Sequence, residues 1–137
     1  MQSFHALRRG AAAVGLLLLS VAGCARPAPA DDPAELARGA ELYEANCAEC
    51  HGGAIGGDIA DIPPRHNAEG HTWHHPDCEL VDIVLNGMPQ RLDFPEMPAH
   101  RDRLSEDDVN AILAHIKTWW TPEQRAHQEE VTEQVCD

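Results

Sequence analysis

The sequence predicts one small helical domain behind an N-terminal export signal. The chain has 137 residues, 43% of them hydrophobic, and this length suits a single domain once the signal is removed. Four later segments begin with a helix-capping residue, and the first three carry apolar side chains at helical spacing. Such caps and stripes are typical of amphipathic α-helices that pack around one core.

Residues 1–23 form the expected export signal. Arg8 and Arg9 precede an apolar stretch at 11–19, which is shorter than the roughly 20 residues of a spanning helix. The following Val-Ala-Gly-Cys24 resembles the lipobox of bacterial lipoproteins, whose cysteine is lipidated and becomes the new N-terminus. The alternative is a plain secretory signal, which would leave a secreted or periplasmic protein. Both readings export the chain, and Ala25 favours the outer over the inner membrane.

Residues 24–31 form a Pro/Ala tether, and residues 32–120 the expected domain. An extended tether reaches about 25 Å at roughly 3.1 Å per residue, which keeps the domain close to the membrane. Asp32 as N-cap and Pro33 predict a first helix over residues 33–46. Its apolar stripe includes Tyr43, and Gly39 beside this stripe permits close approach of another helix.

The first helix leads into the motif Cys47-Ala48-Glu49-Cys50-His51. This C-x-x-C-H spacing is typical of covalent haem attachment. Two thiols one turn apart can each add to a haem vinyl group, and the adjacent imidazole can bind the iron. A redox motif, a zinc half-site and a disulfide are the alternatives. A redox motif would have a strand before it, and a zinc site a second pair of cysteines or histidines at matching spacing, and the sequence indicates neither. We expect one covalently attached haem c per chain.

A histidine-rich loop spans residues 71–77. We expect the Trp73 indole and an imidazole such as His74 to bind the haem propionates, whose charge needs partners. The cluster from His71 to His75 could instead bind copper or zinc. Asp77 is the expected N-cap of a second helix that ends at Gly87.

The sixth iron ligand is expected to be Met97, which follows His51 by 46 residues and precedes a proline. Met88, at the end of the preceding helix, and histidine remain alternatives. A thioether ligand favours ferrous iron and raises the potential relative to a bis-histidine haem.

Two more helices complete the chain. Ser105 caps a helix whose apolar stripe runs from Val109 to Trp120, and Thr121 caps a polar tail helix at residues 122–134 within the tail 121–137. Lipid and haem use three of the five cysteines, so Cys78 and Cys136 are expected to pair in an oxidising compartment. Two free thiols are the alternative.

From Pro33 to Trp120 the chain resembles a class I mono-haem cytochrome c with His/Met ligation. Besides the haem motif, the resemblance rests on Gly39 with Tyr43, on Trp73 as a propionate donor, and on Met97-Pro98 before the last core helix. It implies an all-α cytochrome c fold with crossed N- and C-terminal helices. It also implies Pro63 as the residue whose carbonyl accepts from His51. Arg65 then stands where the family has an apolar residue against the haem, which departs from the pattern.

The composition indicates what the chain binds. There are 10 Lys and Arg against 23 Asp and Glu; without residues 1–23, which contain Arg8 and Arg9, 8 basic residues remain and the net charge is −15. This charge argues against nucleic acid and predicts a redox protein or membrane oxidoreductase with a basic docking face as partner. The alternative is that the acidic surface serves solubility only. The sequence thus predicts a tethered one-electron carrier without a small-molecule substrate. A fixed subunit of an oxidoreductase and a metal-handling or ligand-sensing protein are the alternatives.

Overall fold

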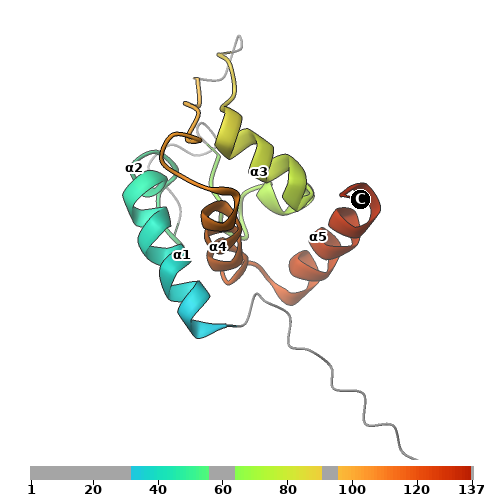
Figure 1. Ribbon diagram of the computed structural model, residues 1–137. Helices are drawn as coiled ribbons and strands as arrows, with labels where there is room; N and C mark the ends of the chain where they lie inside the picture. Colours follow the sequence, from blue (N-terminus) through green and yellow to red (C-terminus); the bar gives the residue numbers. More distant parts are fainter. Residues whose placement is uncertain (1–31, 56–63, 91–95, 137) are drawn as a thin grey trace, which may run out of the picture.

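The computed structural model describes residues 32–55, 64–90 and 96–136, and helices form its framework (Figure 1). Within these ranges there is no strand, and Met88 and Met97 form an isolated β-bridge. The predicted all-α class is therefore confirmed. The elements in order are α1 (Pro33–Asn46), α2 (Ala48–His51), the 3-10 turn η2 (Thr72–His74), α3 (Asp77–Asn86), α4 (Glu106–Lys117) and α5 (Pro122–Val135).

Helices α1 and α4 pack against each other, and Figure 1 shows α4 between α1 on one side and α3 and α5 on the other. Gly39 makes this contact possible, because a Cβ atom there would overlap the carbonyl oxygen of Ala111 on α4. Helix α1 begins where the cap predicts, with the Asp32 carboxylate accepting from the N–H of Ala34 at 2.9 Å. The expected pairing of the first helix with the last core helix is thus present.

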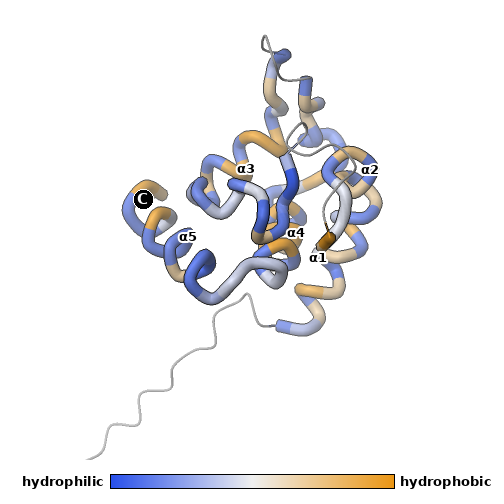
Figure 2. Tube along the Cα trace, turned by 180° about the vertical axis from the view of Figure 1, so that it is seen from behind, coloured by the Kyte–Doolittle hydropathy of each residue, from blue (hydrophilic) through white to orange (hydrophobic). Residues whose placement is uncertain are grey.

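Helix α4 supplies most of the core. Its N-terminus carries a reciprocal capping box between Ser105 and Asp108. The predicted stripe is buried, and Trp120, just after the helix, is only 5% exposed. Figure 2 shows that much of the tube is blue, hydrophilic, with orange, hydrophobic segments in between on the helices. The core contains Tyr43, Leu80, Leu104, Val109, Ile112, Leu113, Ile116 and Trp120.

Helix α3 begins one residue away from the predicted cap. Pro76 is the N-cap and Asp77 the first helical residue, so the expected capping role of Asp77 is wrong. The Asp77 carboxylate instead accepts from Lys117 at 2.6 Å and from the Gln128 amide at 2.7 Å. The helix ends at Gly87 as predicted, with a φ of 74° that suits glycine.

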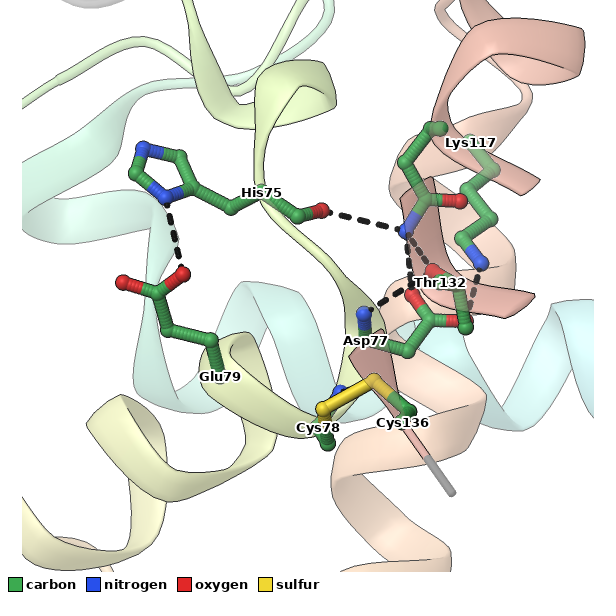
Figure 3. Close-up of a disulfide and its surroundings, with 8 residues drawn as sticks. His75, Asp77, Cys78, Glu79, Lys117, Thr132 and Cys136 are labelled. Carbon is green, nitrogen blue, oxygen red and sulfur yellow. Dashed lines mark hydrogen bonds and ion pairs between the residues drawn. A yellow bond between two sulfur atoms is a disulfide. The ribbon is translucent and has the colours of Figure 1, made fainter. Parts of the chain in front are cut away.

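Helix α5 is the extra helix after the core, and a disulfide holds its end. Cys136 is bonded to Cys78 on α3, with the two Cα atoms 5.7 Å apart (Figure 3). Gln128 on α5 is 1% exposed and donates to the His75 carbonyl and the Asp77 carboxylate. The pairing expected from the cysteine count is thus the one in the structure, and it explains how so polar a helix stays docked.

Candidate functional site

The haem motif lies at the junction between α1 and α2. Cys47 closes α1, with its N–H donating to the Tyr43 carbonyl at 2.8 Å, and α2 then runs from Ala48 to His51. Cys47 is half-buried, Cys50 is exposed, and neither thiol is bonded. His51 is 8% exposed. One short turn of helix therefore carries both free thiols and the buried imidazole.

A proline carbonyl orients the His51 ring. His51 Nδ1 lies 2.8 Å from the carbonyl oxygen of Pro64. Since a carbonyl only accepts, Nδ1 carries the proton and Nε2 keeps its lone pair, which is the form that binds iron. Burial lowers the pKa of His51, although the bond to Pro64 opposes this shift, so the ring stays neutral. The free thiols and this imidazole fit a haem c.

The acceptor is one residue later than expected. Pro63, the predicted acceptor, lies outside the described residues, and the carbonyl bonded to His51 is that of Pro64. Two consecutive prolines look alike in a sequence, and only the path of the loop decides which carbonyl meets the ring. Cys24, the expected lipidation site, also lies outside the described residues.

The segment after His51 is held in place by hydrogen bonds from distant residues. The Tyr43 hydroxyl donates to the Gly52 carbonyl at 2.7 Å, and Asn67 donates to the Ala54 carbonyl at 3.1 Å. Burial raises the pKa of Tyr43 well above its usual range, so the hydroxyl remains a donor. The aromatic residue expected on the first helix thus fixes the backbone beside the iron ligand.

His66 is a site residue that the sequence analysis missed. Its ring stacks on His51, with centroids 4.2 Å apart and planes 26° from parallel. Burial, with smaller contributions from His51 and His71, lowers the pKa of His66 to about 3. Counted from Pro64 in place of Pro63, the position two residues later is His66 and not Arg65. Residues two apart in an extended segment point to the same side, and this spacing from Pro64 is the signal that could have indicated His66.

The two candidate methionines lie side by side. Met88 and Met97 exchange two backbone hydrogen bonds of 2.9 and 3.0 Å. Gly87 permits this pairing, because a Cβ atom there would lie 2.6 Å from the Met97 carbonyl oxygen. The fold therefore brings the loop that holds Met97 against the end of α3, and both methionines are half-buried.

His100, three residues after Met97, is a buried histidine near the same loop. It is 5% exposed, and its Nδ1 lies 3.0 Å from an Arg103 guanidinium nitrogen. Because guanidinium only donates, Nδ1 is the acceptor and the ring proton is on Nε2. A nitrogen that carries a proton has no lone pair for iron, so this geometry disfavours His100 as a ligand.

The side chains of the histidine-rich loop make contacts within the protein. The single indole N–H of Trp73 donates to the Gly70 carbonyl at 2.9 Å, and His74 stacks on Trp73 with centroids 3.6 Å apart. The His74 ring also lies 5.9 Å from that of His127 on α5. The structure thus gives Trp73 and His74 partners within the protein, and their contacts with the haem propionates stay a prediction.

The second-metal alternative finds no support among the described residues. The His71 and His75 rings have centroids 5.6 Å apart, and His75 Nδ1 lies 3.3 Å from a Glu79 carboxylate oxygen. In the described parts of the chain, no group of three or more His, Cys, Asp or Glu residues is arranged to hold a metal ion.

Comparison with known proteins identifies the family. Residues 34–116 match the family model described as cytochrome c oxidase, cbb3-type, subunit III. The cytochrome c subunit of the cytochrome bc1 complex from Corynebacterium diphtheriae is 36% identical over 94 residues, which cover 64% of this chain and 28% of that protein. No solved structure matches the chain.

The chain is also similar to two further proteins. Photosystem II extrinsic protein V from Cyanidium caldarium is 33% identical over 103 residues, covering 63% of this chain and 64% of that protein. The cbb3-type cytochrome c oxidase subunit FixP from Sinorhizobium medicae is 28% identical over 102 residues, covering 71% of this chain and 34% of FixP. The chain spans less than two thirds of the length of each of these three relatives. It belongs to the family of cytochrome c oxidase, cbb3-type, subunit III, and is a c-type cytochrome, an electron-transfer protein.

Proposed function

We propose that the chain is a one-electron carrier with one haem c bound covalently through Cys47 and Cys50. The observation that carries the proposal is the His51–Pro64 bond, which leaves the Nε2 lone pair of a buried imidazole free beside two unbonded thiols. A bound haem supplies an iron that cycles between Fe(III) and Fe(II). The chain's own task is to hold that group in one orientation and away from bulk water, and to present its edge to partners.

Met97 is proposed as the sixth ligand, with Met88 as the competing residue. A thioether ligand favours Fe(II) and gives ferric haem a weak far-red absorption band. We expect the Met97→Ala variant, made with haem-attachment machinery, to lose this band, and Met88→Ala to keep it. Because the two residues share one β-bridge, they form a matched pair. Loss of the band only in Met88→Ala would make Met88 the ligand, and a wild type without the band would favour a histidine or an open iron site.

The carrier is proposed to be anchored by lipid at Cys24 on the periplasmic side of a membrane. The lipobox-like segment supports this, and the tether keeps the haem domain near the surface. In the described residues, no helix combines the length and apolar character needed to cross a membrane. Mass spectrometry of the membrane fraction should find a lipidated Cys24, and Cys24→Ala should release a haem-loaded protein. An unmodified wild-type protein in the soluble fraction would contradict the anchor.

A fixed subunit of a larger oxidoreductase is the second candidate. Two relatives carry names of complex subunits, which favours this reading. Helix α5 lies outside the family match at residues 34–116 and offers a surface for such a complex. Copurification with other subunits at high salt would favour the fixed subunit. Dissociation of the protein from its partners as the salt concentration rises would favour the carrier.

A further inference from the structure

The ring of His66 covers one face of the iron-binding imidazole. The two rings are 4.2 Å apart between centroids and only 26° from parallel. The Pro64 carbonyl fixes His51 at a single atom, Nδ1, and a hydrogen bond at one atom still permits the ring to turn about the bond axis. A flat group against the face of the ring removes this remaining freedom.

His66 is itself held by two independent bonds. The Thr72 hydroxyl donates to the Arg65 carbonyl at 3.3 Å, so its oxygen accepts from His66 Nδ1 at 2.8 Å. The Trp120 indole donates to the His66 carbonyl at 2.7 Å. Thr72 is 4% exposed and Trp120 is 5% exposed, so water does not compete for these bonds. Both the backbone and the ring of His66 are therefore fixed.

We propose that His66 is a positioning residue that sets the plane of the His51 imidazole, with Thr72 locking the His66 ring. This inference rests on the proposed role of His51 as the iron ligand. Core packing by itself does not require this arrangement, because an apolar side chain could fill the space without a hydroxyl partner. A histidine here brings a polar ring nitrogen, Nδ1, that needs a partner, and the buried Thr72 hydroxyl supplies it.

The plane of the axial imidazole determines how unpaired spin spreads over a ferric haem, so the proton NMR shifts of the haem methyl groups measure it. We expect His66→Leu, which fills space without a flat ring, to change the pattern of these shifts and to move the reduction potential. His66→Phe keeps a flat ring but loses the bond to Thr72, so it should change the pattern less than His66→Leu does. Thr72→Val should change the pattern in the same direction as His66→Leu but less. Thr72→Ser keeps the hydroxyl and should keep the wild-type pattern.

Thr118→Val is the matched control, because the exposed Thr118 hydroxyl also donates to a carbonyl, that of His115, at 2.7 Å. The proposal is wrong if His66→Leu and Thr72→Val keep the wild-type pattern and potential, or if Thr118→Val changes them as much. Should His66→Leu fail to load haem, the comparison of Thr72→Val with Thr72→Ser decides, because both variants keep His66 and only Thr72→Ser keeps the hydroxyl that bonds to its ring. A wild type that binds no haem through His51 would refute both the function and this role, whereas identical variants would refute the role alone.

Discussion

Gly39 shows how one missing side chain decides a helix contact. The site of its absent Cβ is filled by the Ala111 carbonyl of α4, which is backbone and cannot rotate away. The close approach of α1 and α4 therefore depends on this residue, and with it the position of the haem motif at the end of α1.

We predict that Gly39→Ala destabilises the protein by roughly 1–3 kcal/mol or more, because the helices must part to admit a methyl group. Thermal unfolding followed by circular dichroism measures the loss. The control is Gly53→Ala, where an added Cβ meets nothing within 4 Å and the φ angle is not positive. Equal unfolding temperatures for the two variants would contradict the prediction.

At the same scale, the sequence predicts the chemistry of site residues better than their partners. The spacing of Cys47, Cys50 and His51 is local, so their role can be read directly. The choice of Pro64 over Pro63, and the contact of His66 with His51, depend on how a loop returns to the ring from 13 residues away. Because the sequence analysis placed the acceptor one residue too early, it considered Arg65 where the structure has His66.

Among the elements, α4 has the clearest start signal, and its cap also binds α1. The Ser105 hydroxyl and N–H both donate to the Asp108 carboxylate, at 2.6 and 2.9 Å, and Arg38 of α1 forms an ion pair with the same carboxylate. These bonds, with Ser105 contributing most, hold the pKa of Asp108 below its usual value. The stabilisation is therefore present above the unfolded pKa of about 3.9 and is lost as pH falls through the folded value.

We predict that Asp108→Asn is less stable than wild type at pH 6 and that the difference shrinks as the pH falls below about 4. Urea unfolding over this pH range gives the comparison. Glu106→Gln removes a charge from the same helical turn and serves as control. A difference between wild type and Asp108→Asn that stays constant down to pH 3 would show that the carboxylate charge does not matter.

Helix α5 is an element that its own sequence hardly stabilises, since it is polar and buries little. Its buried Gln128 amide donates to the His75 carbonyl, the Asp77 carboxylate and the Thr132 hydroxyl. Figure 3 shows the three accepting residues, His75, Asp77 and Thr132, close to the disulfide between Cys78 and Cys136. The docking of α5 thus depends on polar contacts as well as on the covalent link.

We predict that Gln128→Leu costs about 1–3 kcal/mol even with the disulfide intact, because buried acceptors lose their donor. Gln134→Leu is the control on the same helix, at an exposed amide that bonds only within α5. Urea unfolding and limited proteolysis of α5 measure the two effects. Wild-type stability in Gln128→Leu would show that the disulfide alone holds the helix.

For the whole molecule, charge is the property that partners meet first. With residues 1–23 removed, 8 basic and 23 acidic residues give a net charge of −15. Long-range attraction raises the encounter rate with a positive partner, and salt screens it over a Debye length of about 8–10 Å.

We predict that reduced protein is oxidised faster by a cationic metal complex than by an anionic one of similar driving force. Raising the salt concentration should slow the first reaction and accelerate the second. Stopped-flow absorbance follows both reactions. Equal salt dependence for the two oxidants would mean that the acidic surface lies away from the haem edge and serves solubility only.

The sequence by itself determined the four longer helices, the caps of α1, α4 and α5, the haem motif and the disulfide pair, because each depends on neighbouring residues or on counting cysteines. Only the tertiary structure decided that Pro64 accepts from His51, that His66 covers the ring, and that Trp73 and Asp77 bond inside the protein. The physical reason is that a polar side chain bonds to whichever buried partner the fold brings within about 3 Å. Residues far apart in the chain supply these partners, and local pattern carries no record of them.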